Sequence, residues 1–116
     1  MTISESQILQ EGHGMNDDLN MINAIKEYIY NIDEPECWWP KSEFNRVSYK
    51  KWAANEVLVF VLSHTDWTPT RSVEEFKYMM SKYMYKPTYQ QDVTEIFSIA
   101  YETADDISDI LSAMLY

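Results

Sequence analysis

The sequence is poor in the residues on which several protein classes depend. It contains one cysteine, Cys37, and two glycines, Gly12 and Gly14, among 116 residues. A single cysteine excludes an internal disulfide, and so few glycines exclude the glycine-rich loops of P-loop and dinucleotide-binding proteins. No apolar run approaches the roughly 20 residues of a membrane span, and the first residues lack the basic and apolar regions of a signal peptide. We therefore expect a cytoplasmic protein that does not enter a membrane.

Basic residues are also scarce, and the charges are unevenly distributed. The formal net charge is −10, from nine bases and 19 acids. Residues 1–36 carry eight acids and one base, residues 37–86 carry five acids and eight bases, and residues 87–116 carry six acids and no base. Direct binding to nucleic acid or to an anionic membrane requires a basic footprint, which this chain lacks. The charge favours a basic partner protein instead.

What is abundant is apolar periodicity, which predicts an all-α fold. With 46% apolar residues, the chain suits a single compact helical domain over residues 16–116, preceded by a flexible N-terminal arm over residues 1–15. A first helix is expected to begin with Asn16 as its N-cap and to end before Pro35. Its apolar stripe consists of Leu19, Ile22, Ile25, Ile29 and Ile32.

The middle of the chain predicts two further helices. After a loop over residues 33–46, Ser48 could cap a helix from about 48 to 63 that is buried nearly all round as the central element. Its apolar run over residues 57–62, taken alone, would also fit a buried strand. Ser72 and Glu75 have the spacing of a capping box, so a third helix is predicted from about 72 to 84.

The last segment has the clearest pattern. Apolar residues from position 93 recur in steps of four and three, which predicts one long amphipathic helix. The stripe is Val93, Phe97, Ala100, Ala104, Ile107, Leu111 and Met114. The acids segregate to the opposite side, and we take them as a candidate partner-binding face: Asp92, Glu95, Glu102, Asp105, Asp106 and Asp109. The same heptad spacing leaves a homodimer open.

Within this face lies a DDxxD pattern formed by Asp105, Asp106 and Asp109, which in some enzymes holds magnesium against a diphosphate. That chemistry requires carboxylates that converge across a cavity, with bases nearby for the phosphates. Here the acids share one helix, and no base follows Lys86. We therefore predict no metal site, no cofactor and no catalytic residue.

One enzyme alternative remains. Helical nucleoside triphosphate pyrophosphohydrolases hold magnesium between Glu/Asp pairs spaced i, i+3 on two facing helices. Glu102 with Asp105, and Asp106 with Asp109, supply one such box, but the sequence offers no second box. Histidines and the cysteine show no spacing typical of nucleophilic or metal chemistry.

The acidic face is unusual because it is costly. Glu102 lies three residues before Asp105 and four before Asp106, and Asp109 lies four residues after Asp105 and three after Asp106. These four like-charge pairs together cost about 1 to 2 kcal/mol at low salt. Either the face meets a basic surface outside the molecule, or bases of the middle segment fold against it. The candidate bases are Lys50, Lys51, Arg71, Lys77 and Lys82.

Aromatic residues are the second notable abundance. We expect the four tryptophans to lie mostly in the core, with Cys37 as a packing residue beside two of them. Trp38 and Trp39, in the predicted loop, are the weaker candidate partner-binding site, as an exposed aromatic anchor. Lysines alternate with tyrosines over residues 74–89, but acidic flanks favour a packed helix face there over nucleic-acid binding.

Residues 52–111 resemble small acidic helical proteins of unknown function encoded on phages and integrative elements of low-GC Gram-positive bacteria. The resemblance rests on the runs WAANEVLVFVLSH, TPTRSVEEFKYMMSKYM and IFSIAYETADDISDIL. It implies an accessory protein of a mobile element, a setting in which small acidic proteins often inhibit host defence nucleases. It implies no active residue.

Together these features predict a non-enzymatic acidic protein-binding module. Its partner would be the basic nucleic-acid-binding surface of a host defence protein, which the acids would occupy as a DNA mimic of the anti-CRISPR or anti-restriction type. A homo-oligomeric accessory or structural protein of a mobile element is the alternative binding hypothesis, with the Trp38-Trp39 loop or the long helix as its interface.

Overall fold

The described part of the chain forms four helices, as a computed structural model shows. The structure describes residues 15–84 and 91–115, without the side chains of residues 15, 16 and 91–93. The helices are α1 (Met15–Tyr30), α2 (Lys41–Ser63), α3 (Pro69–Met84) and α4 (Gln91–Ala113). No strand occurs within these ranges, so the all-α prediction is confirmed and residues 57–62 are helical. The predicted arm over residues 1–15 lies outside the described residues except for Met15, which already belongs to α1.

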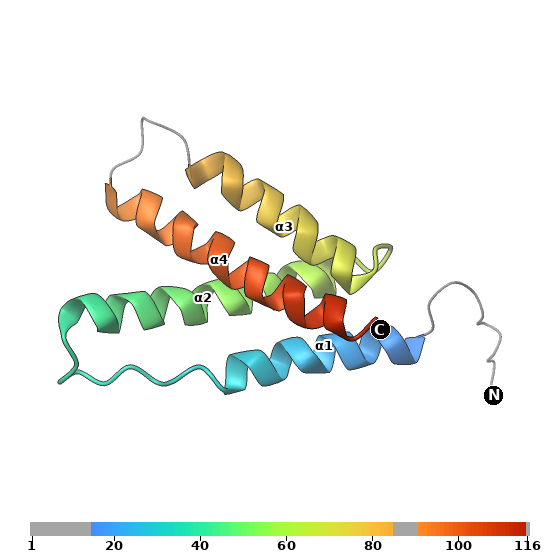
Figure 1. Ribbon diagram of the computed structural model, residues 1–116, viewed down its shortest axis with the longest axis horizontal. Helices are drawn as coiled ribbons and strands as arrows, with labels where there is room; N and C mark the ends of the chain where they lie inside the picture. The colour runs from blue at the N-terminus through green and yellow to red at the C-terminus, as the bar shows by residue number, and fades with distance from the viewer. Residues whose placement is uncertain (1–14, 85–90, 116) are drawn as a thin grey trace.

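Helix α4 lies at the centre of the arrangement. It contacts all three other helices, runs side by side with α3, and crosses obliquely over α2 (Figure 1). Ala100 and Ala104 are fully buried, and their small side chains allow α4 to approach the neighbouring helices closely. The predicted long helix is confirmed, with Ile107 and Leu111 continuing its buried stripe. Met114 was predicted to share this stripe but is exposed.

The core combines residues from every helix. Apart from the buried positions of α4, its members are Met21 and Ile25 of α1, Ala53, Ala54, Val57 and Val61 of α2, and Val73, Phe76 and Met80 of α3. Among the described residues, none of the helices combines the length and hydropathy needed to span a bilayer.

Helix α2 begins earlier than predicted. Its first residue is Lys41, so Ser48 is an interior residue and not a cap, and residues 41–46 are not loop. Pro40 occupies the N-cap position, and its carbonyl accepts the Phe44 backbone N–H at 2.9 Å. A proline fits there because its fixed φ suits the helix start and its missing N–H costs nothing. The first two turns of α2 contain several charged residues and show no apolar periodicity, so the sequence pattern did not indicate this start.

Helix α3 also begins before its predicted start. Thr68 is the cap, because its hydroxyl accepts the Arg71 backbone N–H at 3.2 Å, and Pro69 follows in the first helical position. Ser72 is therefore not a capping residue. It lies one turn inside the helix, fully buried, and its hydroxyl has no hydrogen-bond partner among the described residues.

Helix α1 corrects two smaller predictions. It begins at Met15, so Asn16 lies inside the helix and is not its N-cap. Leu19 was assigned to the apolar stripe but is exposed, whereas Met21 is buried beside Ile25. The helix thus packs through a face rotated slightly from the one that the isoleucine spacing indicated.

The largest packing error concerns α2. It was predicted to be buried nearly all round, yet Val59 is 56% exposed and Leu62 is 49% exposed. The four tryptophans were also expected mostly in the core, but Trp38 and Trp52 are exposed, and so is Cys37. The apolar residues of α2 therefore serve both the core and the surface of the molecule.

Candidate functional site

The candidate site is a row of acids on the outer side of α4. At 100° per residue, Glu95, Glu102, Asp106 and Asp109 project within an arc of about 60°, and all four are exposed. With a rise of 1.5 Å per residue, the row extends over about 21 Å. We call these four residues the acidic row. Asp92 belongs to the same helix, but its side chain lies outside the described residues.

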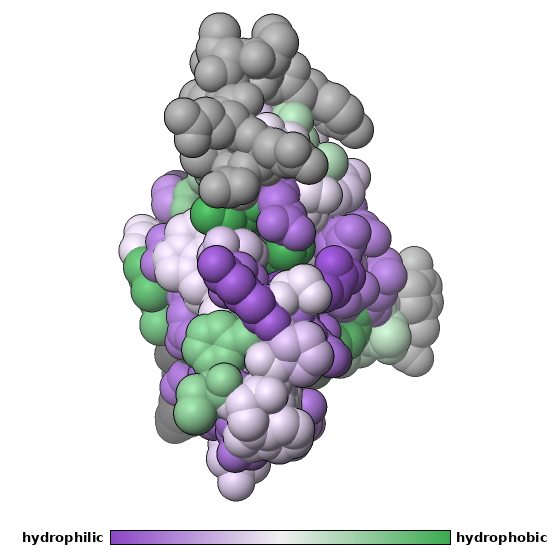
Figure 2. Space-filling model, turned by 90° about the vertical axis from the view of Figure 1, so that its left-hand side faces the viewer, coloured by the Kyte–Doolittle hydropathy of each residue, from purple (hydrophilic) through white to green (hydrophobic). Residues whose placement is uncertain are grey.

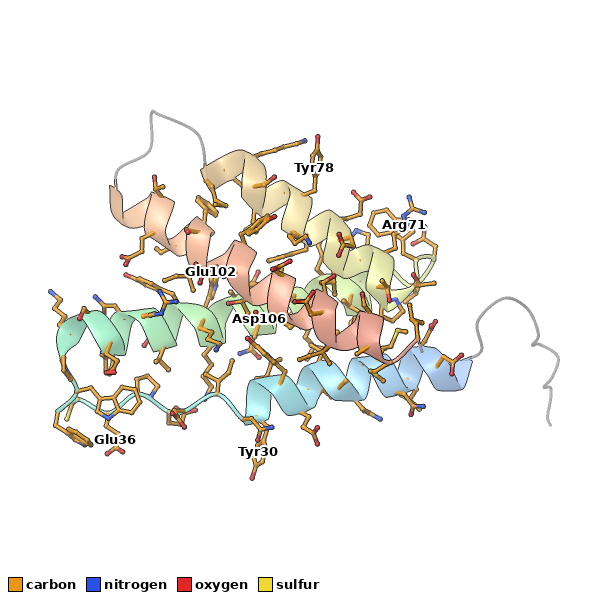
Figure 3. The ribbon with its side chains drawn as sticks, viewed as in Figure 1. Tyr30, Glu36, Arg71, Tyr78, Glu102 and Asp106 are labelled. Atoms are coloured by element: carbon orange, nitrogen blue, oxygen red, sulfur yellow. The ribbon has the colours of Figure 1, made fainter. Side chains whose placement is uncertain are left out.

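Each of the other three helices sends one polar side chain to the acids of α4. The Tyr28 hydroxyl of α1 donates to Asp106 Oδ2 at 3.4 Å. Arg46 of α2 pairs with Glu102 at 3.2 Å, and Lys77 of α3 pairs with Asp105 at 3.1 Å. Glu102 and Asp106 are seen one turn apart on α4 in Figure 3. Glu95 and Asp109 form no ion pair or hydrogen bond with any described side chain.

Asp105 is drawn away from the acidic row toward α3. Lys77 Nζ lies 3.1 Å from Asp105 and 3.5 Å from Glu74, and the Ser108 hydroxyl donates to Glu74. Because Lys77 is only 22% exposed, this pairing is better shielded from water than an ordinary surface ion pair. Asp105 is therefore part of the α3–α4 contact, and among the described members of the predicted face it is the least available to a partner.

Two groups around these acids have shifted proton affinities. Burial raises the pKa of the Tyr28 phenol, and the charge of Asp106 and the hydrogen bond to it raise it further. For Lys77, burial acts to lower the pKa, but the hydrogen bond to Asp105 and the charges of Glu74 and Asp105 outweigh it and raise the pKa. Both groups keep their protons well above neutral pH, so this arrangement persists under physiological conditions.

The proposed internal neutralisation is thus partial, and it combines one predicted base, Lys77, with one that was not predicted, Arg46. Of the five candidate bases, only Lys77 contacts a described acid of α4. Lys51 pairs with Glu34, while Lys50, Arg71 and Lys82 lie over the rings of Tyr28, Trp67 and Tyr78 respectively. Arg46 was missed because its segment had been predicted to be loop, and recognising Pro40 as a helix start would have placed it on α2.

The DDxxD carboxylates do not converge. Asp105 is directed to Lys77 of α3, whereas Asp106 accepts from Tyr28 of α1, on the other side of α4. In the described part of the chain, no three His, Cys, Asp or Glu side chains are placed to hold a metal ion together. The pyrophosphohydrolase alternative therefore has no second acidic box to complete it among these residues.

The weaker candidate site is the loop between α1 and α2. Trp38 is 73% exposed, and its indole N–H donates to Glu36 Oε1 at 2.9 Å. Its ring meets the Trp39 ring edge to face, with centroids 6.3 Å apart. This end of the molecule faces the viewer in Figure 2, where hydrophilic side chains are interspersed with near-white and green ones. Trp38 is thus an exposed aromatic ring held in position by two neighbours.

Comparison with known proteins gives no relative from which a function could be transferred. No family model, no curated protein and no solved structure matches this chain.

Proposed function

We propose that this protein is a binding module whose acidic row occupies a basic, nucleic-acid-binding surface of another protein. The supporting observation is that four exposed carboxylates lie in line along about 21 Å of one helix, and two of them have no partner among the described side chains. A row of like charges on a rigid rod presents negative charge at fixed intervals, as a nucleic-acid backbone does. Such a row would steer association with a basic surface.

The internal contacts of the row are compatible with this function. The Arg46–Glu102 pair is exposed on both sides, with side-chain exposures of 62% and 59%, and such pairs contribute between zero and about 1 kcal/mol. A base from a partner could therefore replace Arg46 at little cost. The buried side of α4 packs against α2 and α3, so the backbone that carries the carboxylates needs no ordering on binding.

The resemblance of residues 52–111 to proteins of phages and integrative elements directs the choice of partner. In that setting, the basic surface would belong to a host defence protein that handles nucleic acid, such as a restriction or CRISPR nuclease. The protein would then act as a cytoplasmic inhibitor that excludes the nucleic acid from its site, without catalysing a reaction and without binding nucleic acid itself.

The decisive experiment is competition. A partner recovered from a bacterial host by affinity capture at low salt should release its nucleic acid when this protein is added. Release should weaken steeply as salt rises, because the contact is ionic. The triple variant Glu102→Gln, Asp106→Asn, Asp109→Asn should lose competition.

A matched control separates the acidic row from net charge. The triple variant Glu27→Gln, Glu43→Gln, Asp66→Asn removes the same charge from exposed positions on other elements. It should compete almost as well as the unmodified protein. Equal loss in both triple variants, or competition that is indifferent to salt, would contradict a site on α4.

The exposed Trp38 supports a second candidate, a homo-oligomeric accessory protein of a mobile element. Aromatic residues that are exposed and held in position are typical centres of protein interfaces. Light scattering over a range of concentrations would then give a mass above 13.8 kDa that returns to the monomer value in Trp38→Ala. A constant monomer mass would exclude this candidate.

A further inference from the structure

A second surface lies between α2 and α3, where a groove of about 350 Å³ is lined mainly by apolar side chains. Phe60 of α2 and Phe76 of α3 meet within it, with ring centroids 5.7 Å apart. Trp52 and Val59 of α2 and Met79 of α3 also line it. Trp52 and Val59 are exposed large apolar residues, so this groove is apolar surface left open to water.

The apolar surface continues around α2. Leu62, which is three residues from Val59 and therefore beside it on the helix, lines a second groove of about 340 Å³ between α1 and α2. Leu19 of α1 lines the same groove and is exposed. His64 lines both grooves, so they meet at the end of α2. The outer side of α2 thus presents a connected apolar face.

We propose that the α2–α3 groove binds an amphipathic α-helix of a partner protein, one that carries lysine or arginine beside its apolar face. The lining residues run from Trp52 of α2 to His64, the residue that follows the helix, which is about 18 Å at 1.5 Å per residue. This length accommodates about three turns of a helix, the usual length for recognition of a helix in a groove. The flexible side chains of Met79 and Met80 adapt well to such a ligand.

Charge selects a basic helix as the occupant. Glu56 is the one carboxylate among the described lining residues, which include no lysine or arginine. Glu75 lies on the α3 side, four residues before Met79. Lys82, the nearby base of α3, has its ammonium 4.5 Å from the ring centroid of Tyr78. A second copy of this chain would add another net charge of −10, which opposes self-association. This inference concerns a different surface from the acidic row and does not rest on it.

The test uses designed peptides as probes. A 14-residue helical peptide of leucine and lysine, with all leucines on one face, represents the proposed ligand. Two companions isolate its features: a leucine–glutamate peptide keeps the apolar face, and a serine–lysine peptide keeps the charge. In NMR spectra of protein with ¹³C-methyl-labelled methionines, the signals of Met79 and Met80 should shift when the leucine–lysine peptide is added, but not when either companion peptide is added. The signal of Met21 in the core should not shift with any of the three peptides.

Single variants then locate the contact. Val59→Ser and Met79→Ala should each weaken binding of the leucine–lysine peptide about tenfold, as expected for central residues of an interface. Tyr78→Ala is the matched control, because Tyr78 is adjacent to Met79 and exposed but points away from α2 (Figure 3). Glu56→Lys should weaken binding more than Glu27→Lys, which makes the same charge change on an exposed part of α1.

Each contrary result identifies a different error. Equal binding of the serine–lysine peptide, or equal loss in Glu56→Lys and Glu27→Lys, would mean non-specific attraction and would overturn the proposal. Equal binding of the leucine–glutamate peptide would overturn the charge preference. A dimer that is abolished by Val59→Ser would assign the groove to a second copy. Variants of the acidic row, such as Asp109→Asn, should leave peptide binding in the groove unchanged, so the two surfaces can fail separately.

Discussion

Helices α2 and α4 are equal in length, at 23 residues each, and cross one another in the core, yet they divide their residues in opposite ways. Helix α4 places its buried apolar stripe opposite its acidic row, with Ile110 as an exposed apolar exception. Helix α2 has apolar residues on both its buried and its outer side, so Val57 is in the core while Val59 is in water. One helix offers charge to its surroundings and the other offers apolar surface.

The contrast shows that the hydrophobicity of a residue predicts its burial better in α4 than in α2. In α4, a side chain's polarity indicates its position at most sites, because the row is acidic and exposed while the stripe is apolar and buried; Thr103, Ser108 and Ile110 are the exceptions. In α2, polarity does not indicate position, because the outer valine and leucine are as apolar as the core. A surface that keeps apolar residues in water, at a cost in solubility, is expected where another molecule covers it.

The largest expected effect compares one leucine from each helix. Leu111→Ala in α4 should reduce the free energy of unfolding by about 3 kcal/mol, because Leu111 is fully buried and its loss leaves a cavity. Leu62→Ala in α2 should change it by less than about 0.5 kcal/mol, because this leucine is half exposed. Urea unfolding of both variants measures the difference. Similar losses would mean that the outer side of α2 is packed in solution.

The next effect compares two ion pairs of α4, one at its contact with α3 and one with α2. Lys77→Met should cost about 1 to 2 kcal/mol, because it leaves Asp105 and Glu74 as neighbouring, uncompensated acids at a partly buried contact. Arg46→Met should cost less than about 0.5 kcal/mol, because its pair with Glu102 is exposed. Urea midpoints at low salt would show the order, and a larger loss for Arg46→Met would contradict it.

Alkaline pH should loosen the contacts of α4 with α1 and α3. The folded chain keeps the Tyr28 proton above pH 10, where the unfolded chain loses it, because the pKa of Tyr28 is raised in the fold. The raised pKa of Lys77 acts in the same direction, so stability is complete below about pH 10 and falls as pH rises beyond it. Tyr28→Phe should make the fall in urea midpoint between pH 10 and 11.5 shallower. Tyr30→Phe, at an exposed position, should leave the fall unchanged.

The smallest effect reverses sign between the helices. Asp109→Asn should stabilise the fold by about 0.5 kcal/mol, because it removes two like-charge pairs and a carboxylate near the negative end of the α4 dipole. Glu43→Gln in the first turn of α2 should destabilise by a few tenths of a kcal/mol, because a carboxylate is favourable there. Melting temperatures at low salt should move in opposite directions, and both shifts should shrink at high salt.

Periodic and segregated features were predicted well from the sequence. Helix α4 was placed almost to its ends because Ala100, Ala104, Ile107 and Leu111 repeat at helical spacing opposite a run of acids. The four-helix count followed from the same kind of argument. Helix starts were predicted poorly because capping residues are common: Ser48 and Ser72 resembled caps, while Pro40 and Thr68 hold the true positions.

Features that depend on long-range contacts could not be read from the sequence. The partners of Glu102 and Asp106 lie 56 and 78 residues away, and nothing local to Arg46 or Tyr28 indicates them. The grooves beside α2 were missed for a related reason. An apolar residue such as Val59 has the same pattern whether a helix of the same chain or of another molecule covers it.

The central place of α4 has a consequence for the folding of the nascent chain. Because α4 contacts each of the other helices, α1, α2 and α3 leave the ribosome with their inner apolar sides uncovered. The first three helices can pack against one another earlier, but the shared core is complete only after residues 91–113 have been synthesised. Until then the nascent chain exposes apolar surface that chaperones would be expected to shield.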